Sequence, residues 1–250
     1  MVRETVLAAT VAGFIAALIF TLAQSVWVTP LILQSETYEE AAEQAAHRVE
    51  AERGDAHHDN DHETAGAGHH HDANAWKPQD GRERTLFTFA SNLLMGVGYA
   101  FVLIALYLLW REPKTAIDSA LYGLAGFAVF FAAPALGLPP ELPGTAAAEL
   151  TARQQWWGMT AIATAAGLML FAWQPRWWLR LLALAIVVAP HLVPAPHPVV
   201  ESSLAPADLQ SRFRLATALC NALFWLSLGV TSGVTFQKLV VGTDRKSAAA

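Results

Sequence analysis

Long apolar stretches alternate with short polar segments along most of the chain. A helix needs about 20 mostly apolar residues to cross a bilayer, and residues 6–28 form such a stretch without one charged side chain. The pattern predicts six transmembrane helices, at residues 1–29, 86–110, 116–138, 156–173, 177–193 and 213–238. The fifth is the weakest, because it is short and contains Arg180 and Pro190, so five spans is the alternative count.

The polar segments between these spans differ from one another. They comprise a histidine-rich loop at 30–85, outer loops at 139–155 and 194–212, and a tail at 239–250. In the first loop, Thr37 and Glu40 form a capping-box pattern, which predicts a short helix at about residues 38–53. The sequence that follows is polar, glycine-rich and histidine-rich, and it predicts disorder at about residues 54–80.

The composition is typical of an integral membrane protein. Hydrophobic residues make up 54% of the 250 and charged residues 15%, whereas a soluble domain carries about 25% charged residues. The fold class we expect is an all-α, polytopic bundle surrounded by a lipid bilayer. A net charge of −5 provides no basic surface for nucleic acid, and Cys220 alone excludes a disulfide framework.

Motifs of common catalytic sites are also absent from the sequence. It contains no phosphate-binding Gly-x-x-x-x-Gly-Lys-Ser/Thr motif, no His-Glu-x-x-His and no Gly-x-Ser-x-Gly. We therefore expect no enzymatic activity and no ATP hydrolysis by this chain.

The distribution of basic residues predicts an orientation in the membrane. With six spans, both termini share one side with Arg3, Arg111, Lys114, Arg176, Arg180, Lys238, Arg245 and Lys246. The short loops on the other side contain Arg153, Arg212 and Arg214. The positive-inside rule then predicts a multi-pass protein of the inner (plasma) membrane, with cytoplasmic termini and an external histidine-rich loop.

This loop carries the clearest candidate for chemistry. Residues 30–85 hold 13 acidic and five basic residues, and seven of the nine histidines lie between His47 and His71. Imidazole with nearby carboxylates suits divalent transition metals, so we predict that the loop captures such an ion. The candidate ligands are His57, His58, His62, His69, His70 and His71. The alternative is a solvated linker, and the tract does not select a metal, because copper and nickel bind such ligands more tightly than cobalt.

A second candidate metal site lies in the other two outer loops. His191 and His197 lie among four prolines, which end a helix and leave backbone carbonyls free. Glu141 and Glu149 lie in the preceding outer loop, where Arg153 is four residues from Glu149 and is placed to pair with it. These two histidines and two glutamates predict a vestibule that attracts cations, and ordinary interfacial anchoring is the alternative.

Polar and small residues within the spans have structural interpretations as well. Asn92 and Asn221 are candidates for a path across the membrane, and interhelical hydrogen bonding explains them equally well. Gly229 with Gly233, and the series Ala9, Gly13, Ala17, predict close helix–helix packing.

Several short motifs resemble those of the CbtA family, the predicted cobalt transporter subunits of bacteria and archaea. They are residues 27–33 with Glu36, Tyr38 and Glu39, residues 139–144, residues 153–157, residues 190–192 and residues 195–198. The resemblance implies a small membrane protein for cobalt uptake linked to cobalamin biosynthesis, with a one-span membrane partner subunit. It also implies five spans, and it transfers no ion-binding residue.

Together these observations predict a membrane subunit for uptake of a divalent transition metal. Co²⁺ is the expected ion, with Ni²⁺ and Zn²⁺ as alternatives, and passage through the bundle is not driven by ATP. The alternative function is a membrane sensor or an assembly factor that binds and buffers metal without transporting it. A third is a membrane anchor for an enzyme complex, in which the histidine tract is incidental.

Overall fold

The computed structural model describes residues 2–54, 78–200 and 202–242. Within these ranges every regular element is a helix, and one isolated bridge joins Thr145 to Ser203. The α-helices are α1 (Val2–Trp27), α2 (Thr29–Gly54), α3 (Arg82–Leu109), α4 (Ala116–Phe127), α5 (Ala133–Gly137), α6 (Leu150–Trp173), α7 (Trp177–Val188) and α8 (Ala207–Thr235). Two π-helices, η1 (Ala128–Ala132) and η3 (Phe236–Val241), and the 3₁₀ helix η2 (Ala189–Leu192) complete the set. The expected all-α polytopic architecture is confirmed.

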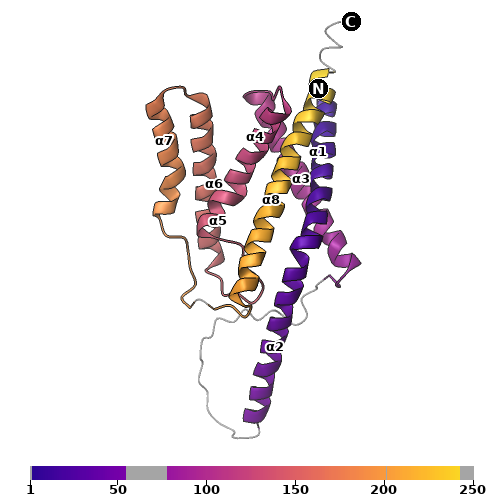
Figure 1. The fold of residues 1–250 in the computed structure, drawn as a ribbon, viewed down its shortest axis with the longest axis vertical. Helices are drawn as coiled ribbons and strands as arrows, with labels where there is room; N and C mark the ends of the chain where they lie inside the picture. The colour runs from indigo at the N-terminus through magenta and orange to yellow at the C-terminus, as the bar shows by residue number, and fades with distance from the viewer. Residues whose placement is uncertain (1, 55–77, 201, 243–250) are drawn as a thin grey trace.

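Among the described residues, five helices are long and apolar enough to cross a membrane. They are Val2–Trp27, Arg82–Leu109, Ala116–Gly137, Leu150–Trp173 and Ala207–Val241. The remaining apolar segment, Trp177–Leu192, is shorter, because its 12 α-helical and four 3₁₀ residues rise only about 26 Å. It is the segment that the sequence already marked as weakest, and it runs back along α6 (Figure 1).

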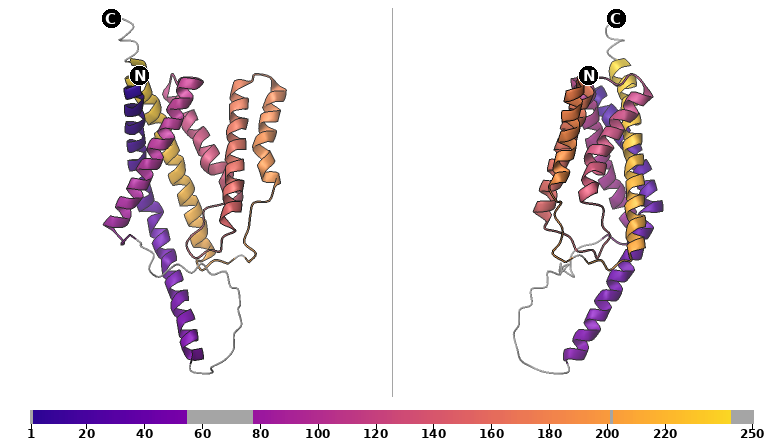
Figure 2. Two further views of the ribbon diagram at one scale, coloured as in Figure 1. Left: turned by 180° about the vertical axis from the view of Figure 1, so that it is seen from behind. Right: turned by 60° about the vertical axis from the view of Figure 1, so that its left-hand side comes forward.

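The helices place the chain ends and the long loops at opposite ends of the bundle. α1 begins beside the end of η3, and we call this the terminus end (Figure 1). The end of α2, the start of α3 and the connections α5–α6 and η2–α8 lie at the other end, which we call the loop end. Figure 2 shows α6 and α7 as a pair set beside α1, α3 and α8, with α4, η1 and α5 in between.

The first loop begins with a longer helix than its sequence pattern indicated. α2 starts at Thr29, directly after α1, because proline is tolerated in the first turn of a helix and Pro30 therefore begins α2 as well as ending α1. Thr37 is not a cap: its Oγ1 donates to the carbonyl of Gln34, 2.8 Å away, inside α2. The predicted start at residue 38 is thus wrong. Most of the segment in which we expect disorder, residues 55–77, lies outside the described residues.

Glycines allow two pairs of helices to pack closely, as the small-residue pattern predicted. A Cβ added at Gly13 of α1 would lie 2.5 Å from the backbone nitrogen of Val97 in α3, and Ala9 and Ala17 are fully buried beside it. Between α4 and α8, a Cβ at Gly229 would lie 2.5 Å from the carbonyl oxygen of Ser119. These contacts fix α1 against α3 and α4 against α8.

The two intramembrane asparagines have different roles. Asn92 Nδ2 donates to Thr21 Oγ1 at 3.0 Å and to Gln24 Oε1 at 2.6 Å, so it ties α3 to α1. Asn221 Nδ2 donates to the carbonyl of Thr217 within α8. Interhelical hydrogen bonding therefore accounts for Asn92.

Candidate functional site

A cavity of about 560 Å³ opens at the loop end of the bundle, and we call it the loop-end cavity. Phe130, Phe131 and Pro134 form part of its wall, and residues 138–145 of the α5–α6 connection form another part. The lining is completed by Arg153 and Trp157 of α6, Phe213 of α8 and Ile32 of α2. The cavity is thus lined both by apolar side chains of the bundle interior and by one of the two proline-rich loops.

Hydrogen bonds hold the loop of the cavity in one conformation. The buried side chain of Gln210, in the first turn of α8, donates to the carbonyl of Pro140 at 3.0 Å and accepts from Leu142 N–H at 3.1 Å. Ser35 Oγ of α2 donates to the carbonyl of Pro143 at 3.0 Å. Since Pro140 and Pro143 flank Glu141 and Leu142, these contacts hold the backbone that carries Glu141.

The two outer loops are also joined to each other. Ala146 N–H donates to the carbonyl of Ser202 at 2.9 Å, and Leu204 N–H donates to the carbonyl of Gly144 at 3.2 Å. Gly144 has a φ of +73°, a conformation that a residue with a side chain rarely adopts, and a Cβ there would lie 3.0 Å from Leu204. The loop end is therefore a connected layer built from three segments distant in sequence.

Glu141 lines the cavity and is paired with a cation. Its Oε2 lies 3.4 Å from Arg153 Nη2, and both side chains are partly buried, with exposed fractions of 27% and 31%. The expected pairing of Arg153 with Glu149 is wrong, because Glu149 is engaged by its own helix. Glu141 thus offers a carboxylate to the cavity, and Arg153 lowers the negative charge there.

Glu149 is the N-terminal cap of α6. Its two carboxylate oxygens accept from the N–H groups of Thr151 and Ala152 at 2.8 and 2.7 Å. Hydrogen bonding to Thr151 and then to Ala152 lowers the pKa of Glu149 below its ordinary value. The side chain is exposed at the surface, and it accepts hydrogen bonds from N–H groups of the first turn that have no partner within the helix.

The two histidines of the outer loops, His191 and His197, lie apart from Glu141 and Glu149. The ring of His191 meets the ring of Trp156 edge-on, with centroids 5.8 Å apart, and Trp156 Nε1 donates to the carbonyl of Val193. His197 is exposed. Over the described ranges no three histidine, cysteine or acidic side chains form a group that could hold a metal ion. The structure therefore does not bring His191, His197, Glu141 and Glu149 together.

The six candidate histidines of the tract lie outside the described residues. The structure describes the residues on either side of the tract: α2 ends at Gly54, and the next described residue is Pro78. α2 ends and α3 begins at the loop end of the molecule (Figure 1).

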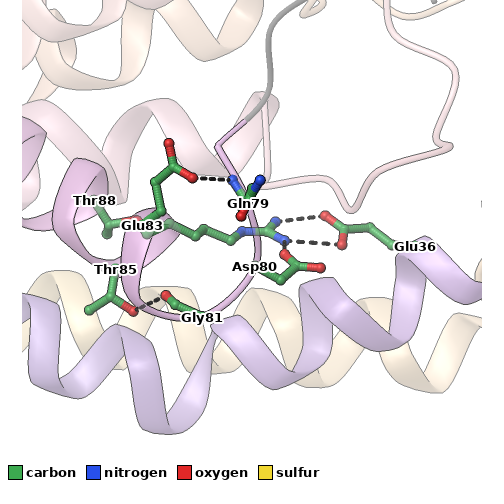
Figure 3. A network of polar contacts seen from close by, with 8 residues as sticks. Glu36, Gln79, Asp80, Gly81, Glu83, Thr85 and Thr88 are labelled. Carbon is green, nitrogen blue, oxygen red and sulfur yellow. Dashed lines mark hydrogen bonds and ion pairs between the residues drawn. The ribbon is translucent and has the colours of Figure 1, made fainter.

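A polar network that no sequence motif predicted joins α2 to the start of α3 (Figure 3). Arg84 forms a two-pronged ion pair with Glu36, at 2.6 and 3.1 Å, and binds Asp80 at 2.9 Å. Gln79 N–H donates to Glu83, which closes the turn before α3. Asp80 and Arg84 of the network line a cavity of about 210 Å³. Gln24 and Thr88 line the same cavity. The sequence gives little indication of this polar network, because Glu36 and Arg84 are 48 positions apart.

A family model described as "Probable cobalt transporter subunit (CbtA)" matches residues 2–237. The chain belongs to the CbtA family. No curated protein and no solved structure shows significant similarity to it. Membership agrees with the five long apolar helices and identifies the protein as a membrane component for cobalt transport, and the word subunit implies a partner.

Within this CbtA chain, the loop-end cavity combines the carboxylate of Glu141 with apolar side chains of the bundle interior. Carboxylate and backbone carbonyl oxygens are suitable, if weak, ligands for a hydrated divalent ion. The roles of Gln210 and Ser35, which hold the loop of the cavity, could not be predicted from the sequence, because each is a single polar residue without a motif.

Proposed function

We propose that this CbtA chain admits a divalent transition metal ion, Co²⁺ in the first place, through the inner membrane without ATP. The histidine tract captures the ion outside, and the loop-end cavity receives it. The observation that carries the proposal is the position of Glu141, a carboxylate held within a cavity that reaches into the bundle of a cobalt transporter family member.

The histidine tract supplies imidazole ligands, which the lining of the loop-end cavity lacks. His57, His58, His62, His69, His70 and His71 are adjacent or closely spaced, so several imidazoles can bind one ion without a preformed site. Because the tract connects Gly54 to Pro78, an ion bound there is tethered near the outer loops. His191 and His197 extend the same ligand chemistry into the second outer loop.

The proposed orientation puts the loop end outside the cell. The terminus end carries Arg111, Lys114, Arg176, Arg180 and Lys238, and an excess of Lys and Arg in short loops favours the cytoplasmic side. A small one-span membrane subunit is the partner we propose, in keeping with the word subunit in the family description.

Cobalt uptake into proteoliposomes tests the proposal. The chain is reconstituted with and without its co-expressed partner, and radiolabelled Co²⁺ is added outside, with Ni²⁺ and Zn²⁺ in parallel. We expect flux into sealed vesicles without ATP. Metal binding without flux under both conditions would favour the sensor or buffering function, and no specific response to metal would favour a simple membrane anchor.

A variant with the six tract histidines replaced by glutamine tests the capture step at constant length. Because glutamine does not replace imidazole as a metal ligand, we expect this variant to need more metal for half-maximal uptake and to keep its maximal rate. Deletion of residues 54–72 should have the same effect. Unchanged uptake at limiting metal in both variants would contradict capture by the tract.

A further inference from the structure

A second cavity, of about 630 Å³, opens at the terminus end between α3, α4 and α6, and we call it the terminus-end cavity. Its lining includes the exposed residues Trp110, Arg111 and Glu112 and, deeper in the bundle, Phe130 and the buried Trp225. Phe130 also lines the loop-end cavity. The two cavities therefore approach each other from opposite ends of the bundle and meet at one side chain.

Four aromatic rings pack together where the cavities meet, and each comes from a different element. Phe130 of η1 stacks on Trp225 of α8, with centroids 5.4 Å apart and planes within 4°. Tyr99 of α3 lies 4.8 Å from Phe130 and 4.7 Å from Trp225, and Trp157 of α6 lies 6.3 Å from Phe130. We call these four residues the ring cluster.

The backbone beneath Phe130 departs from α-helical geometry. Phe130 lies in the π-helix Ala128–Ala132, and such segments are frequent at functional sites. Pro134 follows one turn later and has no N–H to donate back to this turn. On the other side, Gly126 has no side chain, and a Cβ there would collide with the ring of Trp225. The segment that carries Phe130 is thus less strongly tied by its own hydrogen bonds than a regular helix.

We infer that the ion crosses the bundle through these two cavities and that the ring cluster closes the path, with Phe130 as the residue that must move to open it. The identity of the ion rests on the proposed function, whereas the two cavities and the ring cluster do not depend on it. An apolar constriction excludes water, and an ion cannot pass where its hydration shell cannot follow. When Phe130 swings away from Trp225, the two cavities join into one path that water can fill.

Thiol labelling from each side of the membrane tests the geometry without cobalt. In a Cys220→Ser background, one cysteine is placed in each cavity, by Thr145→Cys at the loop end and by Ala125→Cys at the terminus end. A charged methanethiosulfonate reagent that does not cross lipid is added to sealed vesicles of either orientation. We expect Thr145→Cys to react only from the loop side and Ala125→Cys only from the terminus side.

Removal of the ring should join the cavities. Phe130→Ala in the Ala125→Cys protein should raise the rate of labelling from the loop side about tenfold or more. Phe130→Leu keeps most of the volume without the flat ring and should produce a smaller increase in the same direction. Phe127→Ala, in the preceding turn and lining neither cavity, is the matched control and should leave the side of labelling unchanged.

Two results would overturn the inference. Failure of Ala125→Cys to react from the terminus side would mean that lipid fills that cavity, and unchanged loop-side labelling in both Phe130 variants would place the barrier elsewhere. Cobalt flux measured in the same vesicles separates the hypotheses. Flux with either of these results leaves the proposed function intact with another path, whereas joined cavities without flux of any metal would contradict the proposed function alone.

Discussion

Arg153 Nη2 lies 3.4 Å from Glu141 Oε2 and thereby joins α6 to the loop that follows α5. The pair lines the loop-end cavity, and each side chain is about 30% exposed. An ion pair of this exposure contributes little to stability, about 0–1 kcal/mol. Its main effect is on the electrostatic potential of the cavity, because the carboxylate attracts a cation and the guanidinium opposes that attraction.

Replacement of Glu141 should therefore affect uptake more than folding. Glu141→Gln removes the negative charge and leaves Arg153 as an unpaired cation beside the cavity. We expect the metal concentration for half-maximal uptake to rise about tenfold, with little change in the unfolding temperature in detergent. Cobalt uptake across a range of metal concentrations measures the effect.

The double variant Glu141→Gln with Arg153→Gln is the control for charge. Because it removes both charges, uptake at limiting metal should recover part of the loss seen with Glu141→Gln. Uptake by Glu141→Gln equal to that of the unmodified chain would show that the carboxylate has no part in admitting the ion.

Glu149 should behave as a helix cap. Hydrogen bonding holds its pKa below the ordinary value, so the ionised carboxylate favours the folded state above the pKa of an unfolded glutamate. This contribution is lost as the pH falls through the lowered pKa. The unfolding temperature of Glu149→Ala should thus be lower than that of the unmodified chain at neutral pH, and the difference should shrink under acid conditions.

Glu149→Ser separates capping from attraction of the ion. Serine accepts from the same N–H groups without a charge, so stability and uptake should both stay near their original values. A loss of uptake at limiting metal in Glu149→Ser, with stability retained, would assign the carboxylate a role in attracting cations.

The membrane helices were predictable because lipid imposes a simple rule. Backbone groups inside a bilayer must bond within the segment, so a span needs a long apolar run, and the five membrane-length apolar helices of the described residues follow such runs. The close approach at Gly229 was predictable for a similar reason, since small residues spaced along one face let two helices meet. These signals are local in the sequence.

The contacts of the candidate site are not local, and this is why sequence spacing misplaced them. Arg153 is four positions from Glu149, but the bonds of Gln210 to Pro140 and Leu142 bring Glu141 within its reach. Pro30 presents a different difficulty, because the same residue can end one helix and begin the next. The π-helix at Phe130 has no periodicity of its own, so nothing in the apolar run from residue 116 to residue 138 indicated it.

Gln210 should be the most sensitive residue of the loop end. Gln210→Leu leaves the N–H of Leu142 and the carbonyl of Pro140 without their partner, and each unpaired buried group costs about 1–3 kcal/mol. We expect a lower unfolding temperature in detergent and weaker uptake, because Glu141 loses its fixed position. Ser211→Ala, which removes only a bond from an exposed hydroxyl to the carbonyl of Ala207, is the matched control and should be nearly neutral. Equal stability of the two variants would contradict the anchoring role of Gln210.

Gly123 should tolerate no side chain, because it lies where α4 crosses α8. A Cβ there would collide with the carbonyl oxygen of Trp225, and backbone cannot move aside as a flexible side chain can. Forcing the two helices apart should lower the free energy of unfolding by about 1–3 kcal/mol, which denaturant titration of Gly123→Ala in detergent measures. Gly158→Ala on α6 is the matched control: its Cβ would meet no atom within 4 Å, and alanine favours a helix over glycine by about 0.5–1 kcal/mol. The two alanine variants should therefore change stability in opposite directions, and a stabilised Gly123→Ala would show that α4 and α8 are not in close contact.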